Sequence, residues 1–249
     1  GYLERKYYKR SSFVITLSKF SQQHILSQGA KRVLYAPNGI NFSRFTIDSQ
    51  RSNEIIDAAI MCLRKNYDLI IGYAGSHSQL YGTEILLDLA EKSQTAKLKM
   101  AFASIGGGED LKQLEKRRQE RNLSNLILLG PVPKRSVPRF LVNCDILLVH
   151  TRPLETFKLG ISYNKLFEYF AAKKPIVFAS PGVETFPNLV GNWLFPAEPE
   201  SAESILETIE SVRAENSRQK RDFSALQRVI REHDICQIAS KIAEEIRSS

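Results

Sequence analysis

Cysteines are scarce in this sequence, and their spacing excludes two kinds of structural support. Only three occur among 249 residues, Cys62, Cys144 and Cys236, and none belongs to a C-x-x-C pair. An odd number of widely separated cysteines predicts neither a disulfide framework nor a structural zinc site. We therefore expect the protein to work in a reducing cytoplasm.

Long hydrophobic runs are missing as well. No uninterrupted apolar run approaches the roughly 20 residues that span a bilayer, and no charged-then-apolar leader opens the sequence. We expect a protein that is soluble or attached peripherally, for example at the inner face of the membrane. The net charge of +8 favours anionic partners such as nucleotides, nucleic acid or an anionic membrane face. The sequence begins at Gly1 rather than Met, so we also expect further chain upstream.

Several well-defined catalytic and binding motifs are also missing. The sequence contains no Walker A, H-E-x-x-H, G-x-S-x-G, EF-hand or Asp-x-Asp pattern, and we predict no metal site. The glycine cluster "SIGGGEDL" fails the G-x-G-x-x-G fingerprint because Leu111 stands where the last glycine would be. A tight turn between a strand and a helix and a close approach to phosphate both remain open for this cluster.

Apolar and amphipathic segments alternate along the central part of the chain. Five short apolar runs predict strands that are buried on both faces: 69–75, 98–106, 125–130, 145–151 and 174–180. Four segments between them have helical periodicity: 82–93, 109–122, 135–144 and 164–173. This alternation predicts an α/β fold with a doubly wound parallel sheet, whose ligands bind beyond the carboxyl ends of the strands.

The flanking regions follow other patterns. A strand over 12–17, a helix over 19–28 and a strand-like "RVLYA" precede the Pro37-Asn38-Gly39 turn, which is typical of a crossing between domains. Apolar residues at spacings of three and four predict two closing helices over about 200–216 and 220–247.

Two groups of charged or titratable residues have a simple alternative to function. His77 lies in the glycine-rich loop "GYAGSHSQLYG", and a solvated position explains it better than a binding role. Arg117, Arg118 and Arg121 alternate with glutamates and lack accompanying aromatics, so a solvated helix face is favoured over nucleic-acid binding.

The stretch "SYNKLFEYFAAKKPIVFAS" is harder to explain by packing alone. Apolar residues of its helix form the stripe that we expect to face the sheet: Leu166, Phe167, Phe170 and Ala171. Asn164, Lys165 and Glu168 then lie on or near the other side. One interpretation is a solvated face on which Glu168 pairs with Lys165. The other is that the ammonium and the helix amides bind a diphosphate while Glu168 accepts hydrogen bonds from sugar hydroxyls.

Taken in order, six segments resemble one known family. They are "FVITLSKFSQQHIL", "APNGINFSRF", "IIGYAG", "IGGGEDLKQLE", "LILLGPVP" and "NKLFEYFAAKKPIVFAS". The family is that of the retaining GT-B glycosyltransferases, family 4, in the carboxyl-terminal, donor-binding half with its Rossmann-like fold. The resemblance implies that residues 1–36 end an acceptor domain that is largely missing and that 37–219 form the donor domain. Residues 220–249 would form a helix that returns to the amino-terminal domain with an exposed apolar stripe.

By position, the resemblance assigns roles to individual residues. Glu168 corresponds to the glutamate that binds the donor ribose, and the amides of Asn164, Lys165 and Leu166 would face the diphosphate. The loop at Gly75 and Ser76 would border the phosphates. Pro131 and Val132 would line the nucleobase.

Three departures from the family pattern affect the site. The acidic partner that usually stands eight residues before the ribose glutamate is replaced by Gly160, and Ser76 and Tyr81 stand where many members carry Arg and Lys. The "S-x-N-K-L-F-E-Y" variant resembles a subgroup involved in amino-sugar transfer for surface polysaccharides. Our hypothesis is that Lys165 supplies the displaced positive charge.

The resemblance implies a retaining glycosyltransferase with Lys165 and Glu168 as catalytic residues, a nucleotide-diphosphate sugar as donor substrate and no cofactor. Its acceptor would be a sugar or a lipid-linked sugar, with no nucleic acid involved, and the product a cell-surface polysaccharide or glycoconjugate. Two alternatives remain: a non-catalytic nucleotide-sugar-binding subunit, and a sugar-nucleotide epimerase or hydrolase on the same fold. This chain alone would be inactive or weakly active.

Overall fold

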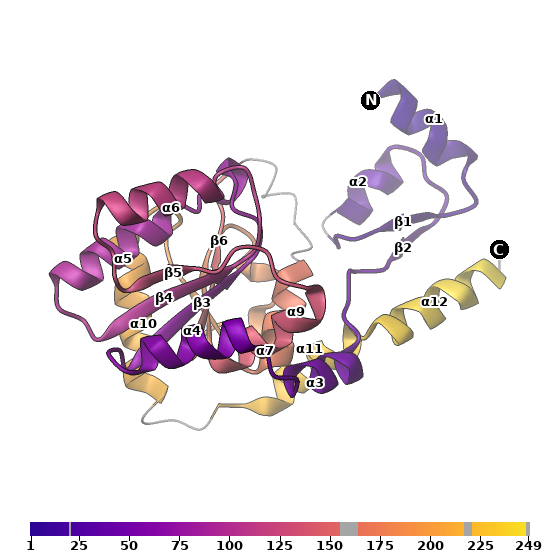
Figure 1. The fold of residues 1–249 in the computed structure, drawn as a ribbon. Coiled ribbons are helices and arrows are strands. Elements are labelled where there is room, and N and C mark those ends of the chain that lie inside the picture. The colour runs from indigo at the N-terminus through magenta and orange to yellow at the C-terminus, as the bar shows by residue number, and fades with distance from the viewer. Residues whose placement is uncertain (20, 155–163, 217–220, 248–249) are drawn as a thin grey trace.

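A six-stranded parallel sheet forms the centre of the molecule (Figure 1). The computed structural model describes residues 1–19, 21–154, 164–216 and 221–247. The strands lie in the order β5-β4-β3-β6-β7-β8. Their bounds are β3 Leu69–Ala74, β4 Met100–Ile105, β5 Leu126–Leu128, β6 Ile146–His150, β7 Ile176–Ala179 and β8 Leu194–Pro196. The predicted α/β fold and its five strands are confirmed, and β8 is a sixth strand that the prediction missed.

Helices cover both faces of this sheet, because alternate side chains of each strand point to opposite sides. Ile70, Leu147 and Phe178 belong to one core cluster, whereas Ile71, Leu148 and Val177 belong to the other. The first face is covered by α4 Glu54–Arg64, α7 Val137–Asn143, α9 Asn164–Ala172 and α11 Phe223–Glu232. The second is covered by α5 Ile85–Thr95, α6 Leu111–Glu120 and α10 Ala202–Asn216. Both faces of the central strands are therefore buried.

Of the described helices, three were not predicted: α1 Tyr2–Arg10, α3 Phe42–Ser49 and α4. Two of them begin at an asparagine cap. The Asn41 side chain accepts a hydrogen bond from the Arg44 amide at 2.8 Å, and the Asn53 side chain accepts one from the Ile56 amide at 3.1 Å. Asparagine is among the strongest amino-terminal caps, so both helix starts could have been found in the sequence.

The amino-terminal region forms a separate small unit that lies apart from the six-stranded sheet (Figure 1). It consists of α1, β1 Val14–Thr16, α2 Ser21–Ser27 and β2 Val33–Tyr35. The two strands pair in parallel, with Ile15 opposite Leu34. The predicted strand and helix are confirmed here, and the domain boundaries stay a prediction.

The single closing helix predicted over 220–247 is wrong, because the chain breaks at His233 and Asp234 into α11 and α12 Ile235–Arg247. The backbone there pairs with the crossing segment instead: the Ile40 amide donates to the His233 carbonyl at 3.0 Å, and the Ile235 amide donates to the Ile40 carbonyl at 3.2 Å. The His233 carbonyl and the Ile235 amide are thus bonded outside the helix, whereas a continuous helix would need both for its own hydrogen bonds.

The apolar stripe predicted for the last helix is only partly exposed. Ile235 and Ile246 are 47% and 58% exposed, whereas Ile238 is buried. In Figure 1, α12 extends away from the large sheet. Across the part of the chain that is described, no helix is both long and apolar enough to span a membrane.

Candidate functional site

A cavity of about 420 Å³ opens at the carboxyl ends of β3 and β4. It is lined by Ala74, Gly75, Ser76, Tyr81, Ile105, Gly106, Gly107, Pro131, Val132, Lys134, Val137, Asn164, Lys165 and Glu168. The sheet order reverses between β3 and β6, so the cavity lies next to the topological switch point, where α/β sheets bind ligands. Every expected binding residue except Leu166 lines this cavity; for Leu166 the expectation concerned the backbone amide, and its side chain is buried in the core.

Tyr169 anchors α9 at this switch point. β3 and β6 pair only at Ile71 and Gly72 and then separate. The Tyr169 hydroxyl occupies the gap, where it accepts a hydrogen bond from the Ala74 amide at 2.8 Å and lies 3.3 Å from the carbonyls of Ala74 and Leu148. Burial raises the pKa of this hydroxyl, so it stays protonated and keeps these bonds. Sequence reasoning missed Tyr169, since an aromatic residue in an apolar helix gives no separate signal.

Lys165 does not lie on the far side of α9 as predicted. It precedes Tyr169 by one helical turn, and its ammonium crosses the edge of the sheet to the hydroxyl of Tyr73, 3.2 Å away. The ammonium also lies 4.5 Å from the centroid of the Tyr73 ring and 4.3 Å from that of Tyr81. Desolvation lowers the pKa of Lys165 to about 7. The Lys165 ammonium therefore lies at the position expected for the phosphates. Its lowered pKa means that it loses its proton more readily than an ordinary lysine.

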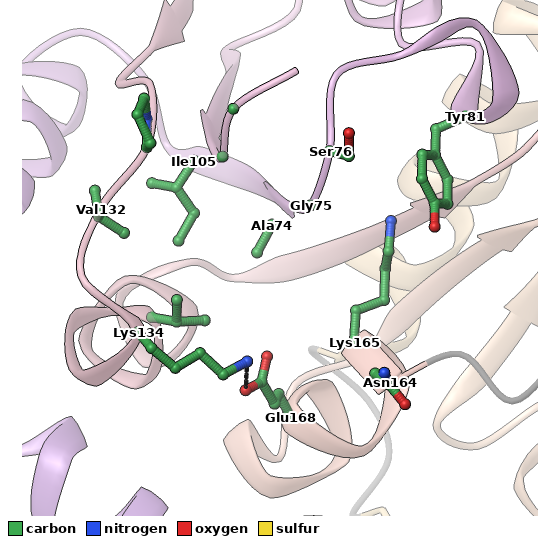
Figure 2. Close-up of a pocket in the computed structure, with 14 residues that line it drawn as sticks. Ala74, Gly75, Ser76, Tyr81, Ile105, Val132, Lys134, Asn164, Lys165 and Glu168 are labelled. Carbon is green, nitrogen blue, oxygen red and sulfur yellow. Dashed lines mark ion pairs between the residues drawn. The ribbon is translucent and has the colours of Figure 1, made fainter. Parts of the chain in front are cut away.

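Glu168 pairs with Lys134, not with Lys165 (Figure 2). Lys134 belongs to the 3₁₀ turn Lys134–Ser136 after β5, and its side chain is 80% exposed, whereas that of Glu168 is 14% exposed. The interpretation of Lys165 and Glu168 as a solvated ion pair is wrong, because the two side chains diverge from α9 toward different walls of the cavity. The carboxylate is thus left facing the cavity beside an exposed cation.

The glycine cluster brings two loops into contact. Gly106 has φ +134°, and a Cβ there would lie 1.8 Å from the Gly75 carbonyl oxygen. Gly108 has φ +149°, and a Cβ there would lie 2.0 Å from the His77 carbonyl oxygen. A side chain at either position is excluded by both backbone conformation and space. The cluster therefore joins the loop after β4 to the loop after β3, and Gly107 of the same cluster faces the cavity.

His77 is buried, so the expectation of a solvated residue is wrong. Its amide donates to the Gly107 carbonyl at 2.8 Å, and its ring Nε2 lies 3.3 Å from the Ser104 hydroxyl. Desolvation, with a smaller repulsion from Lys165, lowers the pKa of His77 to about 4. His77 is thus neutral near pH 7 and serves to hold the two loops together.

His150 is a second buried histidine that sequence reasoning missed. Its Nε2 accepts a hydrogen bond from the Glu200 amide at 3.1 Å, so the proton is on Nδ1, which donates to the Tyr81 carbonyl at 2.7 Å. Desolvation lowers the pKa of His150, which favours this neutral form. The histidine therefore fixes the backbone at Tyr81, whose ring covers Lys165.

Arg118 of α6 and Arg121, which directly follows this helix, contact carboxylates at the surface. Arg118 forms an ion pair with Glu115 at 2.7 Å, and Arg121 forms one with Asp88 at 2.9 Å. These pairs support the interpretation of a charged helix face. Gly160, where the family's other acid is expected, lies outside the described residues. Within the described ranges, no group of three His, Cys, Asp or Glu residues is placed to hold a metal ion.

Comparison with known proteins assigns most of the chain to a family of glycosyltransferases. The family model of "Glycosyl transferases group 1" matches residues 63–225, which is more than half of the sequence. A similar protein is the "Putative colanic acid biosynthesis glycosyl transferase WcaI" of Escherichia coli (strain K12), 26% identical over 208 residues. The match covers 78% of this chain and 47% of WcaI, so the chain spans about half the length of that relative.

Solved structures agree on the fold. A glycosyltransferase from Rickettsia africae ESF-5 superposes with a TM-score of 0.75 at 17% identity, over 100% of this chain and 67% of that one. Anabaena Alr3699/HepE in complex with UDP and glucose superposes with a TM-score of 0.73 at 20% identity, over 96% of this chain and 64% of that one. The Rossmann-like fold expected for the carboxyl-terminal half of a GT-B glycosyltransferase is confirmed. Together with the family match, these findings establish that the chain belongs to the group 1 glycosyl transferases.

Proposed function

We propose that this chain binds a nucleotide-diphosphate sugar and takes part in transferring the sugar to an acceptor hydroxyl with retention at the anomeric carbon, as in family 4. The observation that carries the proposal is one cavity that combines the Lys165 ammonium, the start of α9 and the Glu168 carboxylate. A cation and helix amides suit the phosphates, because helix amino termini favour anions, and a carboxylate next to them suits the ribose hydroxyls.

Lys165 and Glu168 are the residues with proposed chemical roles. As the bond between the anomeric carbon and the phosphate oxygen breaks, negative charge develops on the leaving diphosphate, and the Lys165 ammonium and nearby amides stabilise it. Glu168 accepts hydrogen bonds from the ribose hydroxyls after Lys134 moves aside. Pro131 and Val132 form an apolar wall for the base, and Gly75 and Ser76 border the phosphates. No further cofactor is part of the proposal.

The relatives suggest a first substrate class. Alr3699/HepE was solved with UDP, with UDP and glucose, and with UDP-glucose, and WcaI is described as a colanic acid biosynthesis enzyme. We therefore propose a UDP-sugar as the first donor to test and a surface polysaccharide or glycoconjugate as the product. A lipid-linked acceptor at the inner face of the membrane fits the basic charge of the chain.

Thermal-shift measurements with UDP-, GDP- and ADP-sugars test donor binding, because a bound ligand stabilises the folded state by RT ln(1 + [L]/Kd). A shift is expected with at least one nucleotide sugar and none with the same sugar 1-phosphate, which lacks the nucleoside. No shift with any nucleotide sugar would overturn the proposal.

Turnover distinguishes the alternatives. Release of free nucleotide diphosphate without an acceptor would indicate an epimerase or hydrolase. Transfer by the full-length form, with the product's anomeric configuration matching the donor's by NMR, is expected for a retaining transferase. An upstream stop codon in place of an acceptor domain would indicate a binding subunit.

A further inference from the structure

Tyr73 is a buried residue of β3 that connects two parts of the cavity wall. It is 1% exposed and belongs to the core on the face opposite α9. Its hydroxyl donates to the Ser76 carbonyl at 2.9 Å. Since a hydroxyl carries one proton, it can only accept from the Lys165 ammonium, which lies 3.2 Å away. One hydroxyl therefore holds both the phosphate loop and the proposed phosphate-binding cation.

Among the described residues, Tyr73 is the hydrogen-bond partner of the Lys165 ammonium. In the described ranges, the titratable residues near the ammonium are Tyr73, Tyr81, His77 and His150. Within the described part of the chain, no carboxylate forms an ion pair with Lys165. The Tyr81 ring attracts the ammonium through a cation–π contact, which involves no oxygen acceptor for a hydrogen bond. The direction of the ammonium thus depends on the Tyr73 hydroxyl.

Gly75 completes this arrangement from the loop side. A Cβ at Gly75 would lie 2.7 Å from the Lys165 Nζ and 3.1 Å from the Tyr73 hydroxyl oxygen. A methyl group here would push the ammonium away without removing any hydrogen-bonding group. The Gly75 backbone needs no left-handed conformation, because its φ is not among the positive values of the structure's glycines.

We propose that Tyr73 is a positioning residue, which aims the Lys165 ammonium and the Gly75–Ser76 loop at the same point of the cavity, where the donor diphosphate binds. The position of the diphosphate rests on the proposed function. The coupling of Tyr73 to Lys165 does not, because it is a property of the free protein. Removal of the hydroxyl leaves the ammonium without its acceptor, so the charged form is disfavoured and the pKa of Lys165 falls further.

The first test titrates Lys165 directly, without any nucleotide. Lysines are dimethylated with ¹³C-formaldehyde, which keeps their charge, and the Lys165 signal is identified by its loss in Lys165→Arg. In Tyr73→Phe, the Lys165 signal is expected to titrate at a lower pH than in the parent protein. Tyr67→Phe is the matched control, because Tyr67 is hydrogen-bonded to Ser124 outside the cavity. Equal Lys165 titration in Tyr73→Phe and the parent would overturn the inference.

The second test compares two ligands that differ only in the diphosphate. In Tyr73→Phe, affinity for UDP is expected to fall about tenfold while affinity for uridine is unchanged, because a hydrogen bond involving a charged group is lost at the phosphate position only. An equal loss of both affinities would mean that Tyr73 merely supports the fold.

Gly75→Ala, which displaces the ammonium but keeps the hydroxyl, should also shift the Lys165 titration, and it replaces Tyr73→Phe if that variant does not fold. If the parent protein binds no nucleotide, the proposed function fails and the titration alone decides whether Tyr73 positions Lys165.

Discussion

The carboxyl edge of the six-stranded sheet and the amino-terminal unit contain similar short strands, but they differ in what surrounds these strands. In β3 and β4 every residue is buried. In the amino-terminal unit Ile15 is 43% exposed, and α1 has no buried residue, with Tyr7 at 68% exposed. A two-stranded sheet has too little partner surface to bury its side chains. Similar strand and helix patterns therefore produce fully buried strands only where helices cover both faces of the sheet.

This difference explains where a binding site can form. Around the cavity, each important side chain is held by an element far away in sequence: Tyr169 is bonded to β3, and Lys165 to Tyr73. In the amino-terminal unit, the contacts of α1 are made by exposed or partly buried side chains, such as the hydrogen bonds from Tyr8 to Glu4 within one turn and from Arg5 to Gln28. Precise placement of functional groups requires such support from packed neighbours.

The largest expected contrast between the two regions concerns core aromatics. Phe102→Ala in β4 should lower the free energy of unfolding by about 3–5 kcal/mol, because the Phe102 side chain is fully buried. Tyr7→Ala in α1 should change it by less than about 0.5 kcal/mol. Urea denaturation followed by circular dichroism measures both, and equal losses would contradict the contrast.

A second contrast uses two tyrosine hydroxyls. Tyr169→Phe leaves the Ala74 amide without its partner inside the protein and should cost about 1–3 kcal/mol of unfolding free energy. Tyr8→Phe removes only a contact to Glu4 at a partly buried position and should cost less than about 0.5 kcal/mol. The same denaturation measurement applies, and a Tyr8→Phe effect as large as that of Tyr169→Phe would show that the amino-terminal unit is as well packed as the sheet.

Two lysines provide the corresponding contrast in ligand binding. Lys165→Met should weaken nucleotide-sugar binding about tenfold or more by calorimetry, because a cation at the diphosphate is lost. Lys6→Met, on the exposed side of α1, should leave affinity unchanged. Retained affinity in Lys165→Met would remove Lys165 from the site.

The smallest expected effect is a dependence of binding on pH. The pKa of Lys165 is lowered to about 7, so the free protein loses this positive charge as the pH rises through 7. Donor affinity should therefore fall by about fivefold to tenfold between roughly pH 6.5 and 8, and the slope should vanish in Lys165→Met. A nucleotide sugar is the suitable ligand because its diphosphate does not titrate in this range. Affinity that rises with pH would contradict the assignment.

Much of the site could be predicted, partly from local patterns and partly, as for Ser76, Pro131 and Val132, from the resemblance to a known family. Gly75, Ser76, Pro131, Val132, Asn164, Lys165 and Glu168 each follow or precede a recognisable strand or helix, and all line one cavity. Their neighbours could not be predicted in the same way. His77 looked solvated because its partners, Ser104 and Gly107, come from the next strand and its loop. The break at His233 also depends on a distant segment, Ile40, that supplies its backbone partners.

Sequence alone determined the alternation of buried strands and amphipathic helices, the parallel sheet and the edge at which a ligand would bind, since these depend on periodicity and on the residues next to each strand. Only the tertiary structure decided how the charged groups are paired. Lys165 has a long, flexible side chain, and its partner Tyr73 lies 92 residues away in the sequence. The separation of β3 from β6 beyond Gly72 and the anchoring of α9 by Tyr169 bring these two residues together, and no local pattern encodes that distance.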